Sequence, residues 1–145
     1  MTTLLVLIYI AFISLGLPDS VLGSAWPVMQ AELGAPLSLA GYISMVVSAG
    51  TVVSSLASNR LITRFGVGRV TAVSVLMTAA GLLGISLAPG AWMLFLCAIP
   101  LGLGAGSVDA ALNNFVALHY AARHMSWLHC FWGVGATAGP MILSL

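Results

Sequence analysis

The segment NRLITRFGVGR (Asn59–Arg69) decides the fold class of this chain, because it places three of the four basic residues between two long apolar stretches. The fourth basic residue, Arg123, follows a later apolar stretch. Charged residues make up only 5% of the 145-residue sequence, whereas soluble domains carry roughly 25%. A stretch of about 20 apolar residues crosses the ~30 Å hydrocarbon core of a bilayer as a helix. The sequence therefore predicts an all-α integral membrane protein.

Composition also excludes several classes of protein. The mean hydropathy is +1.13, and a soluble fold of this composition would expose more apolar surface than water tolerates. The net charge is +1, and no basic face is available to bind nucleic acid. Cys97 and Cys130 lie inside apolar stretches and are interpreted as small hydrophobic residues. The three histidines lack the spacing of metal ligands, so we expect no metal site. A membrane enzyme or redox protein is a minor alternative: His119 and His129 could approach one another around haem, but no second pair exists. We therefore expect no cofactor and no enzymatic activity.

The apolar stretches predict a bundle of five transmembrane helices joined by short connections. The first expected loop is Pro27–Pro36, with Glu32 as its only charge, and the second is the basic segment Asn59–Arg69. The third is a tight turn at Pro89–Gly90, and the fourth is Tyr120–Ser126. The expected spans are about Thr3–Trp26, Leu39–Ser58, Val70–Ala88, Trp92–His119 and Trp127–Leu145.

The arginines predict the orientation of this bundle. The loops after the second and fourth spans hold all four arginines, and the loops after the first and third spans hold none. Since positive residues mark the cytoplasmic side, we expect a multi-pass protein of the cell membrane with a cytoplasmic N-terminus. The sequence stops inside its fifth apolar stretch without a polar tail, so residues 1–145 are expected to be the front part of a larger protein.

Two carboxylates lie at membrane depth in the predicted spans. Asp19 follows Pro18 in the first span, and Asp109 lies in the inner half of the fourth span. A carboxylate at this depth is costly unless it is neutral, paired or facing water, so each one is a functional hypothesis. Two structural alternatives exist for Asp19: it could cap a helix that is broken at Pro18, or it could lie near the outer interface.

Helical spacing gives the fourth span a polar stripe. Residues three or four apart share a face of a helix, which aligns two glycines with a carboxylate and an amide. Such a face allows a close approach of another helix and offers hydrogen bonds to a solute. The members of the stripe are Gly102, Gly106, Asp109, Asn113 and Tyr120.

A second stripe of small hydroxyl residues lies along the second span. Small residues of this kind let membrane helices approach and hydrogen-bond to one another, and this packing role is the favoured interpretation. Direct lining of a solute cavity is the alternative, with Ser48 and Thr51 as candidate contacts. In the fifth span, His129 is either a proton-accepting group or a hydrogen-bonded interface residue. The stripe consists of Ser44, Ser48, Thr51 and Ser55.

The whole chain resembles the first five helices of a major facilitator superfamily transporter. The resemblance rests on the alternation of outer and basic inner loops and on the segment Asn59–Arg69, which is similar to the loop between helices two and three of that family. It implies a twelve-helix fold in two halves, each made of inverted three-helix repeats, with the solute bound between the halves. It also implies that Arg60, Arg64, Gly66 and Arg69 belong to a cytoplasmic gating loop. The matching residues are Leu61, Arg64, Phe65, Gly66 and Arg69.

Some family positions differ in this sequence. Asn59 and Thr63 stand where the family usually has Gly and Asp, and that Asp helps to hold the outward-open state. The arginine that drug–proton antiporters carry early in helix four is missing from Ala98–Pro100. The glycines that antiporters carry after the proline of helix five are absent after Pro140. The missing helix-four arginine argues against a proton–drug antiporter, and the substitutions at Asn59 and Thr63 remove the expected gate contact.

Within the superfamily, the chain is most similar to the fucose permease branch of sugar–proton symporters. That branch carries one acidic residue in helix one and another in helix four, which Asp19 and Asp109 match, and it is similar around Asp109–Asn113 and Leu128–Pro140. The resemblance implies proton coupling through the two aspartates. Its expected partners are a small polar solute, protons, the bilayer and the missing C-terminal half. An efflux antiporter and a non-transporting scaffold fragment are the alternatives. The candidate solute contacts are Asn113, Ser48, Thr51 and His129.

Overall fold

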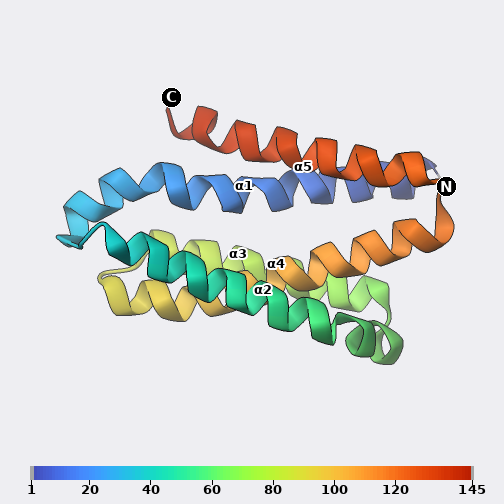
Figure 1. The fold of residues 1–145 in the computed structure, drawn as a ribbon, viewed down its shortest axis with the longest axis horizontal. Coiled ribbons are helices and arrows are strands. Elements are labelled where there is room, and N and C mark those ends of the chain that lie inside the picture. The colour runs from blue at the N-terminus through green and yellow to red at the C-terminus, as the bar shows by residue number, and fades with distance from the viewer. Residues whose placement is uncertain (1, 145) are drawn as a thin grey trace. The chain divides into compact units, whose positions relative to one another are not determined.

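The computed structural model describes residues 2–144, and these residues form five α-helices (Figure 1). They are α1 (Thr2–Leu33), α2 (Ser38–Phe65), α3 (Val67–Ser86), α4 (Ala91–His119) and α5 (Ala122–Leu143). Among the described residues, α1 to α4 are long and apolar enough to cross a membrane. The all-helical membrane fold is therefore confirmed, and the chain is a multi-pass membrane protein. A membrane crossing by α5 stays a prediction.

The helices are longer than the apolar stretches that predicted them. The first helix continues past Trp26 to Leu33, so the expected loop Pro27–Pro36 is wrong and only residues 34–37 connect α1 to α2. Likewise, α2 continues past Ser58 to Phe65. Hydropathy marks only the part of a helix that lies in hydrocarbon, whereas the backbone hydrogen bonds continue until a residue leaves the helical conformation. Both helices are followed at once by a glycine with a positive φ, 58° at Gly34 and 82° at Gly66.

Gly66 alone separates α2 from α3. Its N–H donates to the carbonyl of Ile62 at 2.8 Å, and its own carbonyl accepts from the N–H of Val70 at 3.2 Å. A side chain at a φ of 82° would be strained, which explains a glycine at this position. The expected loop Asn59–Arg69 is therefore wrong: it is a one-residue break between two helices, and α3 begins at Val67.

The later helix boundaries agree with the sequence in one case and differ in another. The helix α4 begins one residue before Trp92 and ends as expected at His119, after a turn around Pro89–Gly90. The helix α5 begins at Ala122, directly after Ala121 in an extended conformation. The expected connection Tyr120–Ser126 is therefore wrong, because most of it is the first turn of α5.

The prolines inside α1 do not interrupt it. Pro18 and Pro27 both lie within the continuous helix Thr2–Leu33. Neighbouring helices and local adjustments tolerate such prolines in membrane helices. Asp19 is therefore not the cap of a broken helix, which removes one of its two structural alternatives.

The chain divides into two compact units. The α2–α4 unit is Met29–Leu112, which holds α2, α3 and the longer part of α4. The α1–α5 unit is Met1–Val28 together with Asn113–Leu145, which holds most of α1, the end of α4 and all of α5.

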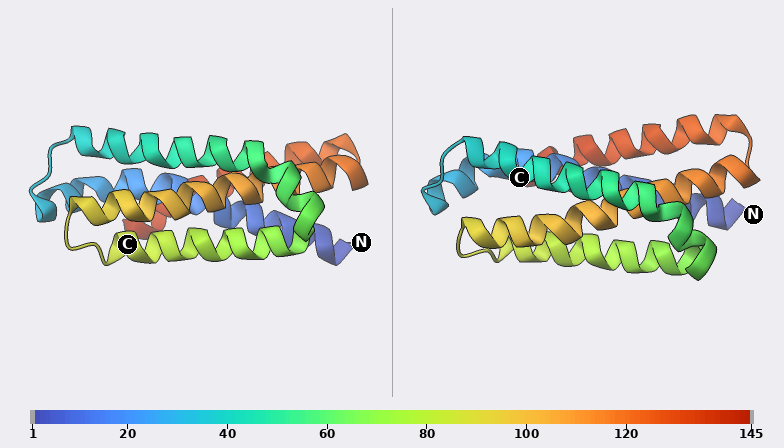
Figure 2. Two further views of the ribbon diagram at one scale, coloured as in Figure 1. Left: turned by 90° about the horizontal axis from the view of Figure 1, so that it is seen from below. Right: turned by 60° about the horizontal axis from the view of Figure 1, so that its bottom comes forward.

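Glycines on α4 set the packing of the α2–α4 unit. A Cβ added at Gly102 or Gly106 would collide with the backbone carbonyl of Val47 or Thr51 on α2, and one added at Gly104 would collide with α3. These contacts run in the same order along α2 and α4, so the two helices are parallel, while α3 lies antiparallel to α4 (Figure 2). Helices that approach this closely gain van der Waals contact along the backbone, which drives association in lipid.

The α1–α5 unit is held together in the same way. A Cβ added at Gly135 would collide with the carbonyl of Ile13, and one added at Gly16 would collide with the carbonyl of Trp132. Gly139 faces Ser20 one turn further along. The order of these pairs makes α1 and α5 parallel neighbours. Gly135 and Gly139 therefore form a GxxxG surface on α5 that packs against α1.

Candidate functional site

A carboxylate and an indole meet on the surface of the α1–α5 unit. The Nε1–H of Trp132 on α5 donates a hydrogen bond to Oδ2 of Asp19 on α1 at 3.2 Å. Both side chains are exposed, and Trp132 keeps 40% of its surface accessible. The pair therefore offers a charged acceptor and a flat aromatic face next to one another.

The glycine contacts place this pair. Gly16 lies three residues before Asp19, and Gly135 lies three residues after Trp132, so all four positions lie near the α1–α5 line of contact. The close backbone approach at Gly16 and Gly135 brings the indole within reach of the carboxylate. A larger residue at either glycine would push the helices apart and break the hydrogen bond.

Asp19 is exposed, and in a membrane protein the surroundings of an exposed side chain include hydrocarbon. A carboxylate that faced hydrocarbon would be costly, so ionisable side chains in membrane helices face the bundle interior or a water-filled cavity. At membrane depth, the face that bears Asp19 and Trp132 is expected to meet water, solute or further protein. A position of Asp19 near the outer interface is the remaining structural alternative.

Asp109 stands out in the same way on α4. Its neighbours Ser107, Val108 and Ala111 are buried, at 6%, 0% and 0% exposure, whereas Asp109 is exposed. Asp109 is thus an exposed residue on a turn of α4 that also holds these three buried side chains. The cost of a carboxylate in hydrocarbon again assigns this face to water or protein.

Two of the small hydroxyl residues of α2, Thr51 and Ser55, bond to α4, whereas Ser48 is exposed. The Oγ1 of Thr51 donates to the carbonyls of Val47 at 3.0 Å and Gly102 at 3.3 Å, and the Oγ of Ser55 donates to the carbonyl of Gly106 at 3.2 Å. The bonds to Gly102 and Gly106 join α2 to α4, as the packing interpretation predicts for Thr51 and Ser55, whereas the bond to Val47 lies within α2. Ser48 is exposed and Asn113 is half-buried. A solute contact by Ser48, Thr51 or Asn113 stays a prediction.

The histidines near α5 take part in an aromatic cluster. The hydroxyl of Tyr9 on α1 lies 2.7 Å from Nδ1 of His124, and the Tyr9 ring stacks on Phe131 at 4.7 Å. His124 is therefore half-buried rather than fully solvated. His129 is exposed, and its ring meets the buried ring of Phe12 edge to face at 6.3 Å. A proton-accepting role for His129 stays a prediction.

The proposed gating residues lie at the junction of α2 and α3. Arg60, Arg64 and Arg69 are exposed on either side of Gly66, and the guanidinium of Arg64 lies 5.5 Å from the centre of the Phe65 ring. Thr63, which replaces the acidic residue of the family, donates its hydroxyl to backbone carbonyls of its own helix at 3.0 Å. Its side chain is bonded within α2, so this position supplies no acidic gate contact.

Cysteine labelling can determine on which side of the membrane these arginines lie. In a cysteine-free background, we expect Glu32→Cys to react with a membrane-impermeant reagent applied outside intact cells, and Arg64→Cys to react only after permeabilisation. Both positions are exposed, so the difference reports the side of the membrane rather than burial. Labelling of Arg64→Cys from outside would reverse the predicted topology.

Sequence reasoning missed Trp132 as the partner of Asp19 and Tyr9 as the partner of His124. Each pair joins residues more than 100 positions apart, and neither has a spacing signal within one helix. The glycines at 16, 135 and 139 were the available signal for close α1–α5 contact, since small residues mark helix interfaces in membranes.

Comparisons with known proteins agree with this architecture. A family model described as Major Facilitator Superfamily matches residues 8–145. The chain is 27% identical over 138 residues to a curated protein of Danio rerio named "Sodium-dependent glucose transporter 1". That alignment covers 93% of this chain and 23% of the relative, so the chain spans about a quarter of the relative's length. No solved structure matches the chain significantly.

Proposed function

The chain belongs to the major facilitator superfamily, and from this premise we propose that its protein is a secondary transporter that moves a sugar across the membrane by alternating access. The name of the similar Danio rerio protein supports glucose or a related sugar as the solute. The same resemblance favours a transporter over an enzyme. Among the described residues, no feature is specific to an exporter.

The observation that carries the proposal is the Asp19–Trp132 pair. Sugar-binding sites need acceptors for hydroxyl groups and an apolar face for the C–H groups of the ring, and binding pockets combine few polar groups with aromatic walls. A tryptophan supplies a large apolar face with one hydrogen-bond donor. The indole bond at 3.2 Å holds Asp19 and Trp132 in one orientation, which reduces the entropy lost when a solute binds.

Two carboxylates are proposed as separate candidates for ion coupling, Asp19 in the α1–α5 unit and Asp109 in the α2–α4 unit. A proton is the first candidate, because a neutral carboxyl enters a closed, dry cavity more easily than a charged one and so biases the conformational equilibrium. Sodium is the second candidate, since the name of the relative specifies it. Uptake into proteoliposomes under a pH gradient alone, or under a sodium gradient alone, separates the two.

We also propose that residues 1–145 supply five helices of the N-terminal half of the transporter. The alignment covers only 23% of the similar transporter, and the twelve-helix architecture needs a second half to enclose the solute. The length of the encoded reading frame tests this proposal directly.

Substitution of Trp132 tests the solute site. In the full-length protein, Trp132→Phe keeps a ring but loses the bond to Asp19, and we expect KM for the sugar to rise by about tenfold, since a hydrogen bond to a charged group contributes roughly 1.5–3 kcal/mol. Trp132→Ala also loses the apolar face and should reduce uptake further. The matched control is Trp127→Phe, an exposed tryptophan on the same helix. Normal sugar uptake by Trp132→Ala would remove this pair from the solute site.

A further inference from the structure

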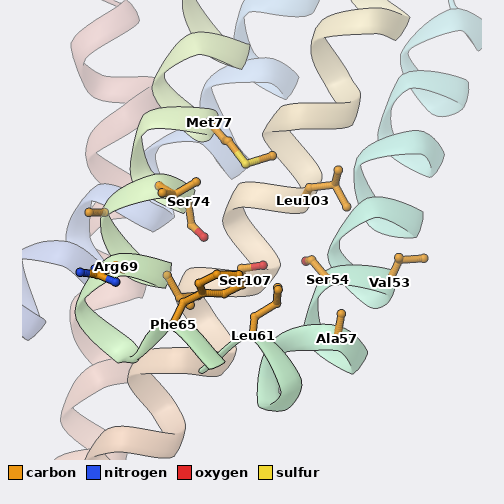
Figure 3. A pocket seen from close by; sticks show the side chains of 13 residues that line it. Val53, Ser54, Ala57, Leu61, Phe65, Arg69, Ser74, Met77, Leu103 and Ser107 are labelled. Atoms are coloured by element: carbon orange, nitrogen blue, oxygen red, sulfur yellow. The ribbon is translucent and has the colours of Figure 1, made fainter. Parts of the chain in front are cut away.

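A cavity of about 580 Å³ lies among α2, α3 and α4, close to the α2–α3 junction at Gly66 (Figure 3). All of its lining residues belong to the α2–α4 unit, and they include neither of the solute-site candidates Asp19 and Trp132. Its volume falls within the 300–1,000 Å³ range of small-molecule sites. The cavity is therefore large enough for a ligand and lies outside the site that the proposed function uses.

The wall of the cavity is almost entirely apolar. Ser54, Ser74 and Ser107 are its hydroxyl residues, and all three are buried at 4–6% exposure. Ser54 donates its hydroxyl to the carbonyl of Thr51 at 3.1 Å, so it is already bonded inside its own helix. The apolar lining includes Val53, Leu61, Phe65, Val73, Met77 and Leu103.

The cavity opens onto the surface of the α2–α4 unit. Of its lining residues, Val53 and Val73 are exposed at 59% and 57%, and Phe65 is exposed at 48%. These residues belong to helices that are apolar enough to cross a membrane. Where protein does not cover such helices, the medium around them is hydrocarbon, and a void without partner atoms forfeits dispersion contacts. The acyl chain of a membrane lipid is therefore the expected occupant of the cavity.

The positive charge at the cavity favours lipids with an anionic headgroup. Arg69 lines the cavity and lies at its margin in Figure 3, and Arg60 and Arg64 lie on the last turns of the adjoining helix. No acidic residue occurs between Glu32 and Asp109 in the sequence, so the α2–α3 junction carries only positive charge. Guanidinium groups bind phosphate through paired N–H donors. The cation at the margin of an apolar cavity is complementary to a phosphate attached to an acyl chain.

We propose that this cavity is a binding site for an anionic glycerophospholipid. One acyl chain lies against Val53, Phe65 and Met77, and the phosphate pairs with the guanidinium of Arg69. The acyl chain alone gains little, because the bilayer outside is equally apolar. Zwitterionic lipids carry the same phosphate, but their headgroup cation is repelled by Arg60, Arg64 and Arg69. The preference for a lipid with net negative charge therefore comes from these arginines together, and it amounts to about fivefold for each arginine near the membrane surface.

Native mass spectrometry of the full-length protein tests the headgroup preference. Phosphatidylglycerol and phosphatidylcholine with identical acyl chains are titrated into the detergent-solubilised protein. We expect phosphatidylglycerol to bind more tightly to the wild type, and Arg69→Gln to weaken its binding about fivefold. The binding of phosphatidylcholine should weaken less, because its choline cation offsets part of the attraction between its phosphate and the arginine. The control Arg123→Gln removes an exposed arginine that does not line the cavity. Glycerol phosphate, which lacks acyl chains, should not compete.

A second pair of variants tests the cavity itself. Ala72 lines the cavity, whereas Ala79 lies seven residues further along the exposed surface of α3 and does not line it. We expect Ala72→Phe to fill the cavity and displace phosphatidylglycerol, and Ala79→Phe to bind it as the wild type does. Crosslinking of wild-type protein with phosphatidylglycerol that carries a diazirine at the end of one acyl chain should modify lining residues of α2 and α3.

Three results would contradict the proposed lipid site. The first is equal binding of the two lipids by the wild type. The second is an unchanged preference for phosphatidylglycerol in folded Arg69→Gln. The third is a crosslink that maps outside the lining residues, which does not depend on how any variant folds. If added glycerol phosphate competes as well as the lipid, the site binds a free anion and the acyl chain has no part in it.

Discussion

Asp109→Asn is expected to abolish ion-driven accumulation of the solute in the full-length protein while insertion into the membrane stays nearly normal. The asparagine keeps the size and hydrogen-bonding capacity of the side chain but cannot bind or release a proton. Removal of a charge at membrane depth should not destabilise the bundle, and Asp109 is exposed rather than packed in the core. The measurement is uptake into proteoliposomes under an imposed gradient.

Counterflow exchange separates the coupling role from solute binding. Exchange of labelled for unlabelled solute needs no net ion movement, so it should survive in Asp109→Asn better than accumulation does. Asp109→Glu restores a titratable group and should recover part of the coupling. The Asp19→Asn variant should show a milder loss of the same kind.

Two outcomes would contradict the assignment of Asp109. Normal accumulation by Asp109→Asn would make the residue structural and move the coupling site elsewhere. Loss of the variant from the membrane would mean that this part of α4 serves only to pack the helices together.

Gly135→Ala is expected to destabilise the α1–α5 unit strongly. The added Cβ would collide with the backbone carbonyl of Ile13, and backbone cannot move aside as a flexible side chain does. Overpacking of this kind costs about 1–3 kcal/mol, and the parting of α1 and α5 should also break the bond between Asp19 and Trp132. We expect a lower unfolding temperature and, in protein that remains folded, a raised KM for the solute.

Gly133→Ala is the matched control for this variant. Gly133 lies two residues earlier on α5, and a Cβ added there meets nothing within 4 Å. The same chemical change should therefore leave the unfolding temperature unchanged or raise it slightly, since alanine favours a helix over glycine. Equal unfolding temperatures for the two variants would show that α1 and α5 do not pack through Gly135.

The sequence alone determined the class of this protein and the approximate position of each helix. Apolar stretches and clustered arginines are local signals, and the thickness of the bilayer converts them directly into spans. The fourth helix, expected at Trp92–His119, differs by one residue from the observed Ala91–His119. The packing interpretation of the small residues on α2 is confirmed for Thr51 and Ser55, which bond to α4. It is not confirmed for Ser44 and Ser48, which are exposed.

The tertiary structure alone decided the helix ends, the residue partners and the cavity. Helices end where the backbone must change, as at Gly66 with its φ of 82°, and not where hydropathy falls. The partnership of Asp19 with Trp132 joins positions 113 residues apart, so it depends on how glycines on two helices meet and on no pattern within either helix. The cavity beside Arg69 likewise exists only because three separate helices enclose it.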